Sequence, residues 1–114
     1  MQIQINTDRN IEGREALAAW VRSEVEDALD RYRAQISRIE VHLSDENAGK
    51  NGQRDMRCMI EARLEGRQPI AVTEEAASKA QAVQGATGKL TRLIAAQLGR
   101  VARSDRSPDK PALD

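Results

Sequence analysis

The sequence predicts an α+β fold, a two-layer sandwich with the order β-α-β-β-β-α, in which two helices cover one face of a four-stranded mixed sheet. Three observations lead to this prediction. Four short stretches alternate apolar with polar residues, which is typical of strands with one buried face. Two longer stretches carry apolar residues at steps of three and four, which is the pattern of amphipathic helices. The length of 114 residues suits one compact domain.

The first strand and the first helix are expected in the first third of the chain. Residues 2–6 alternate, with Ile3 and Ile5 on one side. Residues 14–33 form one amphipathic helix, and the apolar face of this helix comprises Leu17, Val21, Val25, Ala28, Leu29 and Tyr32. The opposite face carries Arg22, Glu24, Glu26, Asp27 and Asp30. That charged face fits either simple solvation or a partner surface.

Three further strands are expected to form an antiparallel meander at residues 39–43, 58–64 and 70–73. Gly and Asn residues within 45–54, and a Gly-to-Pro stretch at 65–69, favour the two connecting turns. A right-handed crossover through the first helix would place the first strand parallel to the second and beside it. Both helices would then lie on one face, as in double-stranded RNA-binding domains.

The last helix is predicted over residues 75–99 or slightly beyond, with Thr73 or Glu74 as its cap. Its buried side would carry Val83, Ala86, Leu90, Ile94 and Val101. Residues 104–114 contain two prolines and mixed charges, which favours a disordered tail after a single domain at 1–103.

Charge is balanced over the whole chain, with 18 basic and 18 acidic residues, but it is unevenly distributed. Residues 76–104 contain no acid. The cations of this segment are Lys79, Lys89, Arg92, Arg100 and Arg103. Positions 89 and 100, and positions 92 and 103, are eleven residues apart, about three helical turns. Lys89, Arg92, Arg100 and Arg103 therefore predict a basic stripe that could contact a polyanion such as nucleic acid, and Lys79 is a further candidate for that contact.

No enzymatic site is predicted. Cys58 falls on the inward side of its strand and His42 on the outward side, so the two cannot form a catalytic pair. Cys58 is best interpreted as a small buried hydrophobe. Asp45, Glu46 and Asp55 surround a loop and are best explained as turn formers rather than metal ligands. No metal, cofactor or small-molecule substrate is expected.

The chain is also not expected to meet a membrane. No apolar run approaches the ~20 residues that a transmembrane helix needs. The first five residues lack the pattern of a signal peptide. A cytoplasmic protein is therefore expected. Its core should be mainly aliphatic, because the chain has one Trp, one Tyr and no Phe.

Several stretches resemble the ribosome hibernation promoting factor and ribosome-associated inhibitor A family, also called sigma-54 modulation proteins. They read VHLSDEN at 41–47, RCMIEAR at 57–63, KL-x-R at 89–92 and AL-x-x-WV at 16–21. The resemblance covers about residues 1–100 and lies in the order and spacing of these stretches. The second domain of the long members is not recognised, so the resemblance is to the short form, and pairing of ribosomes through that domain is not expected.

The resemblance implies a stationary-phase or stress protein that binds the small ribosomal subunit and its rRNA, in the channel for messenger and transfer RNA, and silences translation. It assigns Lys89 and Arg92 to rRNA phosphates, whereas Arg100 and Arg103 follow from helical spacing alone. The family often has cations where this chain has Glu24, Asp27, Asp30 and Ala96, and a different start to the last helix at residues 78–80. The alternative is therefore a protein-binding adaptor of the same fold that has lost the usual rRNA docking mode.

Overall fold

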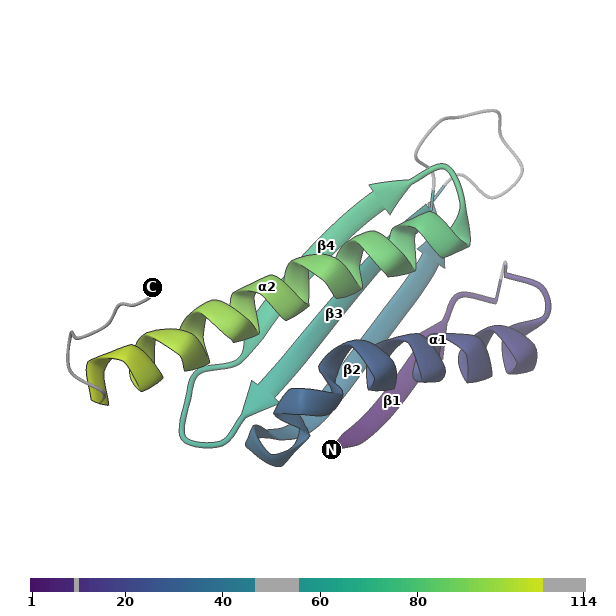
Figure 1. Ribbon diagram of the computed structural model, residues 1–114. Helices are drawn as coiled ribbons and strands as arrows, with labels where there is room; N and C mark the ends of the chain where they lie inside the picture. The colour runs from purple at the N-terminus through teal and green to yellow at the C-terminus, as the bar shows by residue number, and fades with distance from the viewer. Residues whose placement is uncertain (10, 47–55, 106–114) are drawn as a thin grey trace.

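The computed structural model describes residues 1–9, 11–46 and 56–105, the last six of them as backbone only. They form one sheet of four strands with two long helices across one face (Figure 1). The elements in chain order are β1 (Gln2–Thr7), α1 (Arg14–Leu29), the 3-10 helix η1 (Asp30–Gln35), β2 (Ile36–Asp45), β3 (Met56–Leu64), β4 (Ile70–Ala76) and α2 (Lys79–Asp105). The predicted α+β class and element order are confirmed.

The sheet has the strand order β1-β2-β3-β4. β1 runs parallel to β2, from the pair Gln2 and Arg38 to the pair Thr7 and Leu43. The other two pairings are antiparallel, as expected for a meander. Parallel neighbours need a long crossover, and α1 supplies it across the same face that α2 covers.

The core lies between the sheet and the helices and is almost entirely aliphatic. Each predicted alternation places its apolar members inward, because successive strand residues point to opposite faces. The largest fully buried side chains are those of Leu29, Ile39, Leu43, Ile60, Leu90, Ile94, Val21, Val25, Val41, Val83 and Cys58. The sheet face turned away from the helices is mainly polar, with Met59 beside His42 as an apolar exception.

The helical segment after β1 consists of two parts. α1 follows Gly13, whose φ of 65° favours glycine because other residues rarely adopt that conformation. The α-helix ends at Leu29, and the chain continues as η1 before entering β2. The predicted single helix over 14–33 is therefore correct in extent but wrong in its last turn, which is wound more tightly.

The predicted start of the last helix is wrong. Glu74 and Glu75 belong to β4, because the pairing of β3 with β4 extends to Met56 and Ala76. α2 begins at Lys79, and Ser78 caps it by accepting a hydrogen bond at Oγ from the Gln81 main-chain N–H, 3.1 Å away.

The C-terminal end of α2 also differs from the expectation. The helix continues to Asp105, beyond the expected end near Gly99, while the division into a domain at 1–103 and a tail at 104–114 stays a prediction. The rest of the predicted tail, residues 106–114, lies outside the described residues. Within the parts of the chain that are described, no helix is long and apolar enough to cross a membrane.

Candidate nucleic-acid interface

The five predicted cations all lie on α2, but their surroundings differ. Lys79 is the first residue of the helix and is half-buried, whereas Lys89 and Arg92 are exposed and one turn apart. Lys79 is thirteen residues before Arg92, about 220° around the helix, so the two cations do not share a face. Arg100 and Arg103 lie within α2, but their side chains are outside the described residues.

Lys89 holds α2 against strand β4. Its Nζ lies 2.8 Å from Glu74 Oε1 and donates a hydrogen bond of 2.8 Å to the main-chain oxygen of Thr73. Both contacts come from the strand beneath the helix. A carboxylate at this distance offsets much of the lysine charge, so Lys89 offers a phosphate less attraction than the sequence predicts.

A glycine makes this contact possible. A Cβ atom at Gly85 would lie 2.7 Å from both Cγ and Cδ of Glu74, well inside normal van der Waals contact. The Glu74 side chain therefore lies across the bare backbone of Gly85 and reaches Lys89 one turn further along. Glu74, Gly85 and Lys89 form a helix-to-strand clasp, which helical spacing alone does not reveal.

Arg92 is the described α2 cation that is both exposed and unpaired. No hydrogen bond or ion pair joins its guanidinium to another described residue. Beside it lies Leu93, which is 44% exposed. Sequence reasoning missed Leu93, although its position off the buried stripe, next to Arg92, was a signal.

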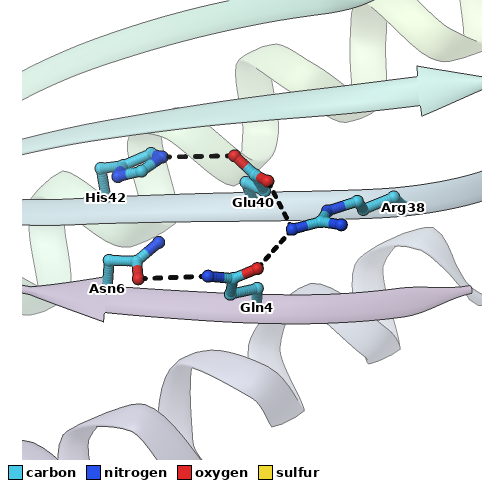
Figure 2. A network of polar contacts seen from close by, with 5 residues as sticks. All are labelled: Gln4, Asn6, Arg38, Glu40 and His42. Atoms are coloured by element: carbon cyan, nitrogen blue, oxygen red, sulfur yellow. Dashed lines mark hydrogen bonds and ion pairs between the residues drawn. The ribbon is translucent and has the colours of Figure 1, made fainter.

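The outer face of the sheet carries an ordered polar network (Figure 2). Arg38 Nη2 lies 2.7 Å from Glu40 Oε2 and also donates to Gln4 Oε1. His42 Nε2 lies 3.6 Å from the other Glu40 oxygen. Gln4 Nε2 in turn donates to Asn6 Oδ1, 3.4 Å away. These contacts hold the Arg38 guanidinium between Glu40 and Gln4, although Arg38 Nε is buried without a hydrogen-bond partner. His42 points outward as predicted.

Acidic residues occupy the other helix of the same layer. Glu24 is half-buried on α1, and Asp27 is exposed on α1. Asp30, at the start of η1, is paired with Arg33 at 3.2 Å. One basic residue of α1, Arg22, donates from Nη1 to the main-chain oxygen of Ile3, 3.0 Å away. The side of the helical layer at α1 is therefore acidic, as the sequence indicates.

The cysteine is buried as expected. Burial raises the pKa of the Cys58 thiol from 9.0 to about 12, because a thiolate cannot be solvated there. Among the described residues, no three His, Cys, Asp or Glu side chains lie together in a way that would hold a metal ion. Asp55, one of the loop acids considered above, is outside the described residues.

A four-stranded sheet under two helices, with cations on α2, is an architecture compatible with a small ribosome-associated protein. The family described as "Sigma 54 modulation protein / S30EA ribosomal protein" matches residues 3–102, and the chain belongs to that family. Its members are ribosome-associated factors without enzymatic activity. The predicted non-enzymatic class is thereby confirmed.

Solved structures agree with this assignment. The Protein Y N-terminal domain of Thermus thermophilus is 29% identical, with a TM-score of 0.65, and the match covers 82% of this chain and 96% of that one. A ribosomal subunit interface protein from Coxiella burnetii is 19% identical, with a TM-score of 0.58, and the match covers 87% of this chain and 99% of that one. At this identity the match supports the fold alone. A search of curated proteins found no match.

Proposed function

We propose that this protein binds the small ribosomal subunit through its rRNA and silences translation in stationary phase or stress, acting in the cytoplasm. Family membership supports association with the ribosome. The single structural observation that carries the RNA contact is the exposed, unpaired guanidinium of Arg92 on a helix without acids between residues 79 and 104. Arg suits phosphate recognition because its planar fork donates in pairs.

The two residues that resemblance assigns to phosphate are therefore not equivalent. Lys89 would have to leave Glu74 and the Thr73 oxygen before it could contact a phosphate fully. Arg92 needs no such rearrangement. Lys79 remains a candidate at the first turn of α2, and Arg100 and Arg103 remain candidates from helical spacing.

Sedimentation with purified small subunits tests the proposal. The wild-type protein should co-sediment at low salt and be released as salt rises, since phosphate contacts displace counterions. Arg92→Glu should weaken binding and make it less dependent on salt, so that the magnitude of the slope of log K against log salt falls by about 1. Arg63→Glu is the matched control, because Arg63 is exposed on β3 on the opposite side of the sheet from α2. Equal binding by Arg92→Glu and wild type would refute the assigned contact.

The second candidate is the protein-binding adaptor, which the carboxylates of Glu24 and Asp27 on α1 favour, since Asp30 is already paired with Arg33. A basic protein segment would be attracted to these carboxylates with a strength that salt reduces. Under this hypothesis Asp27→Lys weakens binding to the ribosome and Arg92→Glu barely changes it. Under the RNA hypothesis Arg92→Glu weakens binding to the ribosome and Asp27→Lys does not.

A further inference from the structure

An open hollow of about 330 Å³ lies between α2 and the edge strand β4. We call it the α2–β4 groove, and its lining residues are Val72, Thr73, Lys89, Arg92 and Leu93. Its volume lies at the small end of the range of about 300–1,000 Å³ for ligand sites. Its surface is mainly apolar, with two cations at the margin.

Leu93 is the feature of the groove that the fold does not explain. Of the large apolar side chains whose exposure the structure describes, it is the exposed one, at 44%. The core stripe of α2 at Val83, Leu90 and Ile94 is fully buried without it. Leu93 therefore adds an apolar surface in the groove, directly beside a free guanidinium.

The charges of the groove favour an anionic ligand. Glu74 is the acid adjoining it, and this carboxylate is already paired with Lys89. Arg92 has no acidic partner among the described side chains. A ligand with a flat apolar part and a negative group would cover Leu93 and meet Arg92 at the same time.

We propose that the α2–β4 groove takes one unstacked nucleotide of single-stranded RNA, with its base against Leu93 and Val72 and its phosphate on the Arg92 guanidinium. This inference rests on the proposed function, because the ribosome would supply the RNA. Proteins that bind single-stranded RNA commonly place bases against aromatic rings or Arg guanidinium planes and the backbone along cations. In this groove the aliphatic side chains of Leu93 and Val72 would take the place of the ring.

A peptide strand fits the groove less well. Strand addition to an edge relies on free main-chain groups of that edge. At Thr73 the main-chain oxygen already accepts a hydrogen bond from Lys89, so an added strand would compete with that contact. A nucleotide needs no main-chain partner from β4.

Binding of two probes by the full chain tests the inference. One probe is an oligoadenylate of about ten nucleotides, within the usual site size, and the other is the same ribose-phosphate chain without bases. The wild type should bind the oligoadenylate about fivefold more tightly, at the low end for base contacts. Leu93→Ala should abolish that preference, and Arg92→Gln should weaken binding of both probes. Gln84→Ala, exposed on α2 about 180° around the helix from Leu93, should behave as wild type.

The outcomes separate this inference from the proposed function. Co-sedimentation of the wild type with small subunits tests the function alone. A wild type that does not distinguish the two probes, or a Leu93→Ala variant that still does, overturns the nucleotide assignment while ribosome binding stands. If Leu93→Ala loses ribosome binding but keeps the base preference, the groove takes a protein segment and the nucleotide assignment is wrong.

Discussion

The clasp between α2 and β4 predicts an unusual response to a helix-stabilising substitution at Gly85. Replacing an exposed helical glycine by alanine ordinarily stabilises a protein by up to about 1 kcal/mol. At Gly85 the added methyl group would lie 2.7 Å from Glu74 Cγ and Cδ, so the Glu74 side chain must move. Its ion pair with Lys89 would then be lost.

The magnitude follows from the exposure of the pair. The side chains of Lys89 and Glu74 are 46% and 28% exposed, so solvent screening limits the pair to about 1 kcal/mol or less. That loss offsets the gain in helix propensity, and Gly85→Ala should leave the free energy of unfolding nearly unchanged. In a Glu74→Ala background there is no side chain to displace, and the same substitution should stabilise by about 1 kcal/mol.

Urea denaturation of the four proteins in this double-mutant cycle provides the measurement, provided the m-value stays constant. Gly99→Ala is the matched control, because a Cβ at Gly99 would meet no atom within 4 Å. It should stabilise by similar amounts with and without Glu74. If Gly85→Ala also gives the same increment in both backgrounds, Glu74 does not lie across the helix and the clasp is refuted.

Two further predictions concern the core and the thiol. Leu90→Ala should cost about 2–5 kcal/mol in denaturant unfolding because Leu90 is fully buried, whereas Leu93→Ala should cost less than about 1 kcal/mol because much of that side chain is already in water. A marked loss for Leu93→Ala would mean that it belongs to the core. Because the pKa of Cys58 rises from 9.0 to about 12 in the folded protein, its contribution to stability is complete below pH 9 and is lost as the pH rises toward 12. By about pH 10 the wild type should lose about 1.4 kcal/mol more than Cys58→Ala does, and equal pH profiles for the two proteins would contradict the burial argument.

The sheet could be predicted because each strand carries its own alternating pattern. For example, the burial of Ile39, Val41 and Leu43 follows from their alternation with polar residues, once one face of the strand is assigned to solvent. The crossover rule then fixed β1 beside β2 without any long-range information. The core stripe of α2 followed in the same way from helical periodicity.

The start of α2 was missed although the strand pattern contained it, whereas the contact of Lys89 with Glu74 could not be predicted. Taking Glu74 as a cap and Glu75 as the first helical residue removed both from the strand, although Val72, Glu74 and Ala76 continue the alternation of β4. Alternation along the longer strand would have placed Glu74 on the face that packs against the helices. A glutamate seldom points toward a packed layer without a partner, so a paired cation could have been expected. Gly85 and Lys89 are four apart and share a helical face, so the clasp depends on a register between helix and strand that no local pattern encodes.

The distribution of charge over the helical layer suggests how a polyanion would be oriented on this protein. α1 and α2 lie side by side on the same face of the sheet (Figure 1). Asp27 on α1 is exposed and acidic, whereas Arg92 on α2 is exposed and basic. A phosphate chain that meets this layer is attracted along α2 and repelled along α1, over the roughly 8 Å that physiological salt allows. It would therefore follow the flank of α2 that faces away from α1. The α2–β4 groove lies on that flank, so attraction by Arg92 and repulsion by α1 both direct the backbone toward the apolar surface of Leu93.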